Sequence, residues 1–135
     1  MAAAPRGSTR DRGRAVEQAV AEYLAAHGLE ILDRNYHAPT ARHAPSVGAE
    51  IDLIARQPVD DGTSTIVFVE VRSRASSAHG SPLETVDRRK QRRIIRAATA
   101  WLVEHDLWER VAVRFDVVAV VGDHAPCWIR GAFEA

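Results

Sequence analysis

The stretch from residue 65 to residue 74 constrains the fold more than any other, because it sets an acid and a base inside an apolar run. It reads Thr-Ile-Val-Phe-Val-Glu-Val-Arg-Ser-Arg, and six of its first seven residues are β-branched or aromatic. Such a run predicts a strand in a sheet that is covered on both faces. Since strand side chains alternate between faces, Glu70 and Arg72 project from one side together.

A preceding strand is expected over residues 49–55, Ala-Glu-Ile-Asp-Leu-Ile-Ala, with a turn at residues 57–64. In a hairpin centred on Asp61, Asp52 falls opposite Glu70, with their Cβ atoms about 5 Å apart. A slip of one residue would instead turn Asp52 to the other face. Two opposed carboxylates repel each other unless a cation lies between them, so the pair predicts a divalent metal site.

A purely structural interpretation of these charges stays open. Glu70 and Arg72 could neutralise each other or pair with the helices, and Asp52 could lie at a solvated strand end. What favours a site is the combination of an Asp on one strand and Glu-x-Arg on the next. This combination gathers hard oxygen ligands and a fixed cation around one point, as metal-assisted phosphodiester hydrolysis requires.

Several motifs together resemble the bacterial YraN family, which is similar in turn to the restriction-endonuclease-like superfamily and its Holliday-junction resolvases. The motifs are Glu17 in a first helix, Glu50-Ile-Asp52-Leu-Ile, Phe68-Val-Glu70-Val-Arg72-Ser-Arg74 and Arg114-Phe-Asp116-Val-Val. The resemblance covers roughly residues 13 to 133.

The resemblance implies a role for each matching residue. Asp52 and Glu70 correspond to metal-binding carboxylates, and Glu17 and Arg72 to the helix acid and the catalytic lysine position. The implied cofactor is Mg²⁺, or Mn²⁺, and the implied substrate is branched or structured DNA, or RNA. Resolvase-like enzymes often pair two subunits, so a homodimer is also compatible with the resemblance.

This chain departs from the family pattern in two ways. Ala49 stands where a Gly usually precedes the Glu-Ile-Asp triplet, after an extra-looking segment from Ala38 to Val47. Arg72 replaces the usual Lys, and a guanidinium stays protonated, so it cannot act as a general base. Arg72 can still stabilise negative charge that develops on a phosphate.

Basic residues are concentrated after the central strand, although the formal net charge is zero. Between residues 72 and 96 there are eight basic residues and two acids. This run predicts a surface that follows a nucleic-acid backbone, or alternatively a solvated helix face. The expected nucleic-acid-binding residues are Arg74, Arg88, Arg89, Lys90, Arg92 and Arg93.

The chain of 135 residues suits one domain, expected over residues 13–135 after a disordered basic tail at residues 1–12. The single cysteine, Cys127, forms no intramolecular disulfide. The N-terminal stretch lacks a signal-like apolar segment, and no run is long enough to span a bilayer. We therefore expect a cytoplasmic protein without a membrane partner.

Helices are expected over residues 11–27 and 85–104, and further strands over residues 30–35, 111–121 and 127–130. The apolar stripe expected for the first helix is Ala15, Val16, Ala19, Val20, Tyr23 and Leu24, with Glu17 at its edge, and that expected for the second is Val86, Ile94, Ala97, Ala98, Trp101 and Leu102. These elements predict an α/β fold, restriction-endonuclease-like by the resemblance, with helices flanking a mixed sheet of about five strands. Trp101 and Trp108 are expected to be core or packing residues rather than base-stacking platforms, and Asp116 to be a structural partner of an arginine. His37 and His43 are left out of the site, and His79 is an untested candidate.

Three functions remain open from the sequence. The first is a Mg²⁺-dependent nuclease for branched or structured DNA, and the second is a nucleic-acid-binding module on the same scaffold without turnover. The third is a protein-interaction domain in which the charges only pair and solvate.

Overall fold

The computed structural model describes residues 9–39, 50–74 and 86–135, with side chains from residue 13 onward. In chain order, its elements are α1 (Thr9–Ala26), β1 (Glu30–His37), β2 (Glu50–Pro58), β3 (Ser64–Arg74), α2 (Arg88–Glu104), β4 (Ala112–Val121) and β5 (Cys127–Phe133). The strands form one sheet in the order β1-β2-β3-β4-β5. The predicted α/β class and five-stranded sheet are thus confirmed.

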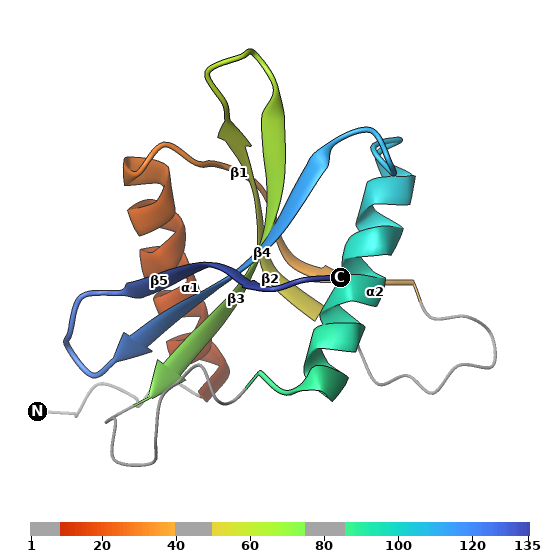
Figure 1. The fold of residues 1–135 in the computed structure, drawn as a ribbon. Coiled ribbons are helices and arrows are strands. Elements are labelled where there is room, and N and C mark those ends of the chain that lie inside the picture. The colour runs from red at the N-terminus through yellow and green to blue at the C-terminus, as the bar shows by residue number, and fades with distance from the viewer. Residues whose placement is uncertain (1–8, 40–49, 75–85) are drawn as a thin grey trace, which may run out of the picture.

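The sheet is mixed because it contains both antiparallel and parallel pairs of neighbouring strands. The pairs β1–β2, β2–β3 and β4–β5 are antiparallel. Strands β3 and β4 are parallel, since the chain between them returns through α2. Figure 1 shows α1 and α2 on opposite faces of the sheet, with the N-terminal halves of both helices toward the end where β3 terminates.

Each face of the sheet carries its own apolar core. Ile66 and Phe68 of β3 pack on the α2 side together with Trp101, whereas Val67 and Val69 pack on the α1 side. From residue 66 to residue 70, every position of β3 is buried. The predicted alternation of faces along this strand, and its cover on both sides, are confirmed.

The β2–β3 hairpin has the register expected from the sequence. Its pairs run from Leu53 with Val69 to Pro58 with Ser64, and the members of each pair are equally far from Asp61. At the turn, Asp61 Oδ1 accepts hydrogen bonds from the backbone N–H and the hydroxyl of Thr63. Gly62 follows with a φ of +85°, a conformation that glycine adopts without strain.

Helix α1 differs from its sequence prediction in start and rotation. It begins at Thr9, two residues before the expected Asp11. Ala15 and Ala19, placed in the apolar stripe by their spacing, are exposed, whereas Ala21 is buried beside Val20 and Leu24. An apolar stripe turned slightly around the helix fits the helical period equally well, so spacing did not show which of these alanines would be buried.

Helix α2 begins at Arg88, later than the expected Thr85. Asp87 caps it, and the Asp87 side chain accepts a hydrogen bond from the backbone N–H of Lys90. An Asp at this position satisfies one of the free N–H groups of the first turn, which sets the helix start. All of the expected stripe is buried: Val86, Ile94, Ala97, Ala98, Trp101 and Leu102.

The prediction of two packed tryptophans is half right. Trp101 is buried, but Trp108 is 47% exposed in the segment after α2. Other predictions concern residues outside the described ranges, among them residues 1–8, most of the segment from Ala38 to Val47, His43, Ala49 and His79. Within the described ranges, no helix has both the length and the apolar character needed to cross a membrane.

Candidate functional site

Asp52 lies where the regular pairing of β2 with β3 ends. The paired residues end at Leu53 with Val69, and Asp52 and Glu70 are the next residues along the two strands. Ile51 packs in the α2-side core and Leu53 in the α1-side core, so the alternation of faces is interrupted at Asp52. The Asp52 side chain accepts a hydrogen bond of 2.8 Å from the Val71 backbone N–H.

The electrostatic environment of Asp52 opposes its ionisation. Burial and then the negative charge of Glu70 raise the pKa of Asp52 to about 8, despite the hydrogen bond from Val71. Glu17 and Glu50 add smaller effects in the same direction. A solvated strand end would not have this effect, so Asp52 is a partly buried acid within a group of carboxylates.

Glu70 is buried, with a relative exposure of 5%, and two cations approach it. Its Oε1 atom lies 2.7 Å from Lys90 Nζ of α2 and 3.4 Å from Arg72 Nε of its own strand. The sequence placed Lys90 among the nucleic-acid contacts and did not predict its ion pair with Glu70. A basic run on a helix does not reveal which of its members faces the sheet.

Glu17 approaches the same group from α1. Burial raises the pKa of Glu17, a hydrogen bond with the Asn35 side chain lowers it, and the charges of Glu50 and Glu70 raise it. Because α1 is rotated relative to the prediction, Glu17 lies on the same side of the helix as the buried Val20 and Ala21. It is therefore nearer the core than the edge of the apolar stripe, where the sequence placed it.

Asn35 was not predicted as part of the site. It lies between Arg34, which pairs with Leu53, and Tyr36, which pairs with Ile51, so it falls opposite Asp52 across β1 and β2. Its φ of 49° is in the left-handed region, where Asn is enriched among non-glycine residues. No sequence signal identified Asn35, because a polar residue near the end of a predicted strand is commonplace.

A cavity of about 380 Å³ opens beside the carboxylates, lined by Gly13, Arg14, Glu17, Asn35, His37 and Glu50. His37 Nε2 lies 4.0 Å from Glu50 Oε1 across the first two strands. A larger cavity of about 1000 Å³ is lined by other residues, including Ile66, Trp101 and His105. We consider the smaller cavity the more relevant one, because Glu17 and Glu50, whose charges affect Asp52, line it, although Asp52 and Glu70 line neither cavity.

The described residues contain no group of three or more His, Cys, Asp or Glu side chains arranged to hold a metal ion. Asp52 and Glu70 nevertheless suit a hard cation, because Mg²⁺ keeps several waters and usually takes one or two protein carboxylates. The charge of such an ion would also favour ionisation of the Asp52 carboxyl, whose pKa is raised by burial and by Glu70.

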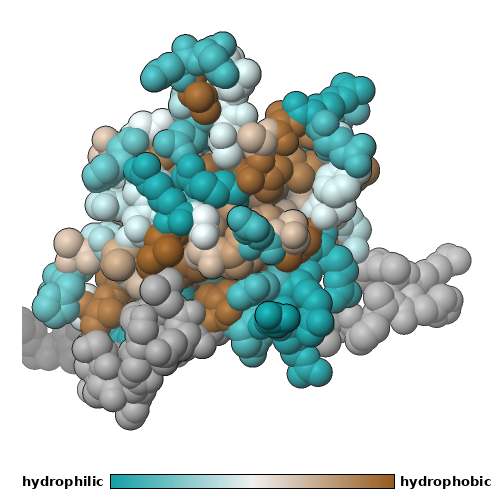
Figure 2. Space-filling view, viewed as in Figure 1, coloured by the Kyte–Doolittle hydropathy of each residue, from teal (hydrophilic) through white to brown (hydrophobic). Residues whose placement is uncertain are grey.

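The predicted phosphate-binding arginines occupy the first half of α2. Arg88, Arg89 and Arg92 are exposed, and Arg93 is half-buried. Figure 2 shows hydrophilic side chains gathered over this half of the helix. Arg74 is half-buried at the end of β3, where its backbone carbonyl accepts a hydrogen bond from Gly122 N–H.

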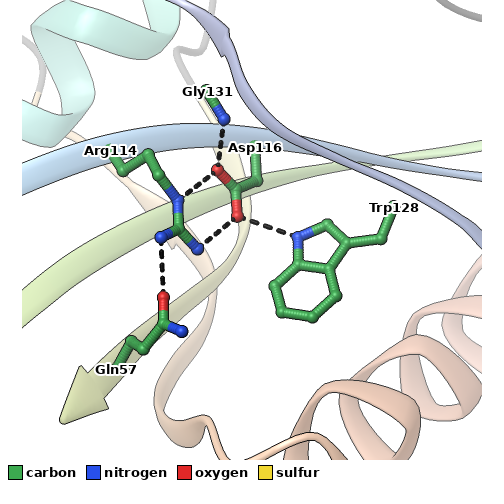
Figure 3. Close-up of polar contacts among 5 residues, drawn as sticks. All are labelled: Gln57, Arg114, Asp116, Trp128 and Gly131. Carbon is green, nitrogen blue, oxygen red and sulfur yellow. Dashed lines mark hydrogen bonds and ion pairs between the residues drawn. The ribbon is translucent and has the colours of Figure 1, made fainter. Parts of the chain in front are cut away.

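Asp116 belongs to a separate structural network, as expected from the sequence. The carboxylate is fully buried and accepts hydrogen bonds from Arg114 Nε and Nη2, at 2.8 and 2.9 Å. Trp128 Nε1 and the Gly131 backbone N–H donate to it as well. Figure 3 shows that Gln57 completes the network by accepting from Arg114 Nη1.

Two helices on a mixed sheet, with acids gathered where the central hairpin stops pairing, define an α/β protein with a cluster of partly buried carboxylates. The chain belongs to the uncharacterised protein family UPF0102, the YraN family, whose model matches residues 16–120. The resemblance noted from the motifs is therefore confirmed.

Relatives in this family match the chain over most of its length. A UPF0102 protein of Chromohalobacter salexigens is 45% identical over 94% of this chain and 94% of its own length. One from an Anaeromyxobacter species is 44% identical over 95% and 88%. One from Pseudomonas putida is 37% identical over 96% and 98%.

Proposed function

We propose that this protein binds structured nucleic acid and hydrolyses its phosphodiester bonds with the help of Mg²⁺ or Mn²⁺. The observation that carries the proposal is the approach of Asp52 to β3, where it accepts from Val71 N–H beside Glu70 and Arg72, and where burial and the charge of Glu70 raise the pKa of Asp52 to about 8. Maintaining an ionisable acid in such a place costs stability, and acids with strongly shifted pKa values concentrate at functional sites.

In this proposal Asp52 and Glu70 would hold the cation. When bound, a divalent cation acidifies a coordinated water and draws charge from a phosphate oxygen. The hydrogen bond from Val71 N–H to Asp52 Oδ2 orients that carboxylate and leaves its Oδ1 atom for a further contact. Glu17, held by Asn35, lies on the helix side of the cluster, where it can orient a water.

Arg72 stabilises charge in this scheme and does not transfer protons. Its guanidinium extends from the same face of β3 as Glu70, with Nε at 3.4 Å from the carboxylate. A fixed cation at this place stabilises charge that develops on the phosphate. The arginines of α2 lie on the helix that also supplies Lys90 to Glu70, so they can hold the nucleic-acid backbone beside the cluster.

The first prediction tests cleavage directly. Purified protein is incubated with branched, single-stranded and duplex DNA and with RNA, with and without Mg²⁺ or Mn²⁺. We expect metal-dependent cleavage by the wild type, loss of cleavage in Asp52→Asn and Glu70→Gln, and equal or tighter nucleic-acid binding by both. Since a bound ion would favour the ionised carboxylates, each substitution then removes a negative charge near the phosphate while keeping the side-chain volume. Asp60→Asn, at an exposed turn position, is the matched control and should cleave normally.

Arg72→Lys provides a complementary arm of the same experiment. It restores the residue usual in the wider superfamily, so an active enzyme should keep or gain rate. Arg72→Ala should lose charge stabilisation of order 3 kcal/mol, as comparable single donors do.

A second candidate function has its own support. Glu70 is already neutralised by Lys90 and Arg72, as expected for a binding module without turnover. If neither the wild type nor Arg72→Lys cleaves any substrate with either metal, hydrolysis is refuted. Measured nucleic-acid binding would then favour the inactive module, and its absence a protein-interaction domain.

A further inference from the structure

Lys90 occupies a distinctive position among the cations of this protein. It is the only lysine in the sequence, at the third residue of α2. Its backbone N–H donates to the capping Asp87, which fixes its place in the first helical turn. From there the side chain reaches the sheet, and its ammonium lies closer to Glu70 Oε1 than Arg72 does, at 2.7 Å against 3.4 Å.

The ion pair occupies one of the two carboxylate oxygens through which Glu70 would hold a metal ion. Glu70 is one of the two carboxylates suited to hold the cation, and Lys90 lies at hydrogen-bonding distance from its Oε1 atom. An ammonium and a divalent cation at the same oxygen repel each other strongly in a partly buried place. Binding of the ion at Oε1 therefore requires the ammonium to move away.

The Lys90 side chain is well suited to such a movement. It is 38% exposed, whereas the Glu70 side chain is 6% exposed, so the ammonium has a route to solvent and the carboxylate does not. A lysine has a flexible stem and a compact charge, while the planar guanidinium of Arg72 on the strand is a more rigid donor. Lys90 also extends from the arginine-bearing turn of α2, beside the expected path of the nucleic-acid backbone.

We propose that Lys90 pairs with Glu70 in the free protein and contacts a phosphate of the nucleic acid once a metal ion has bound. A divalent cation that takes Glu70 Oε1 releases the ammonium, which then contacts a phosphate oxygen of the bound nucleic acid. This inference rests on the proposed function and deepens it, since it assigns a substrate contact to a residue that the free protein uses to neutralise Glu70. Metal and nucleic acid then bind cooperatively, because the first frees the cation that the second needs.

The second prediction concerns Mn²⁺ binding without nucleic acid, measured by the loss of the free Mn²⁺ signal in electron paramagnetic resonance. Lys90→Gln should bind Mn²⁺ at least about fivefold more tightly than the wild type, because a competitor for Glu70 is gone. The matched control is Arg89→Gln, which removes an equal charge from the neighbouring exposed position. It should change Mn²⁺ affinity much less. Lys90→Met serves as a second neutral variant.

A companion measurement follows duplex DNA affinity of the wild type and Lys90→Gln. Without metal the two should bind alike, since Lys90 is engaged with Glu70. With Mn²⁺, under conditions where cleavage is too slow to matter, the wild type should gain at least about fivefold more affinity than Lys90→Gln.

The outcomes separate this inference from the proposed function. If wild type and variants bind Mn²⁺ but Lys90→Gln tightens no more than Arg89→Gln, Lys90 does not compete for Glu70. The inference is then overturned while the metal site stands. If the wild type and Lys90→Gln gain equally in DNA affinity when Mn²⁺ is added, the proposed phosphate contact of Lys90 is overturned. Absence of Mn²⁺ binding by the wild type and every Lys90 variant would overturn the proposed metal-dependent function itself.

Discussion

Asp52 shows how a single residue can lower the stability of the fold. Its side chain is partly buried and lies near the charge of Glu70, and within the described residues a single backbone N–H, that of Val71, donates to it. An acid whose folded pKa is raised favours the protonated state, so folding becomes less favourable as pH rises from the unfolded pKa toward the folded one. For Asp52 this window extends from about pH 4, its unfolded value, to about pH 8.

The third prediction is that Asp52→Asn becomes progressively more stable than the wild type between pH 5 and pH 8 in the presence of a chelator. The amide carries no charge to bury, so its advantage should grow by at least ~3 °C in melting temperature, the shift expected from roughly 1 kcal/mol. Thermal melting followed by circular dichroism at each pH measures it. A constant difference across this range would show that Asp52 ionises without penalty. Glu70→Gln should move the effect to lower pH, because the charge that faces Asp52 is removed.

Among the elements, α2 serves both the core and the candidate nucleic-acid surface. Its apolar face, with Ile94, Ala97 and Trp101, closes the core over β3. Its first half carries exposed arginines, and Arg88 and Arg92 lie one turn apart on the same side of the helix. Since the apolar stripe fixes the rotation of the helix, it also fixes the direction in which these arginines point.

The fourth prediction is that Arg88→Ala and Arg92→Ala each reduce the salt dependence of duplex DNA binding. A phosphate contact releases counterions, so each lost contact should flatten the plot of log affinity against log salt by ~0.9 units. Fluorescence anisotropy over a series of salt concentrations measures the slope. Arg110→Ala is the control, because Arg110 is exposed beyond α2 and paired with Asp106. If all three variants keep the wild-type slope, the arginines of α2 form a solvated helix face.

For the whole molecule, the network of Asp116 ties β4 to β5 and, through Gln57, to β2. The fifth prediction is that Asp116→Ala destabilises the domain by about 3 kcal/mol, because the half-buried Arg114 guanidinium loses its acid and the Trp128 and Gly131 N–H groups lose their acceptor. Urea unfolding measures the change. Replacing both members, as in Arg114→Met with Asp116→Leu, should cost less than the single change. An equal or larger cost would show that the ion pair contributes net stability.

The sequence predicted much of the fold because the strongest patterns were local. Strand β3 was identified by its β-branched run, the hairpin register by the turn around Asp61, and the α2 stripe by its spacing. Each of these follows from periodicity or turn chemistry within one segment. The rotation of α1 was predicted less well, because its small residues satisfy the helical period on more than one face.

The candidate site was harder to predict because it depends on contacts across elements. Strand alternation brought Glu70 and Arg72 together, but it is interrupted at Asp52, where the backbone leaves the regular ladder. Asn35 takes part through a left-handed conformation, and Lys90 through the rotation of a helix. Neither property has a signature in a single sequence.

The parallel pairing of β3 with β4 also has a consequence for the order of folding. In the β1–β2–β3 meander each strand pairs with the next one in the chain, and only residues 59–63 separate β2 from β3, whereas β4 can join β3 only after the chain has passed through α2. Contacts between neighbouring segments form at a lower entropic cost, so we expect the meander to assemble first. Asp52 and Glu70 both belong to it and would face each other before Lys90 arrives. Docking of α2 on the meander is then electrostatically favourable, because it brings the Lys90 ammonium to Glu70 and relieves the repulsion between the two acids.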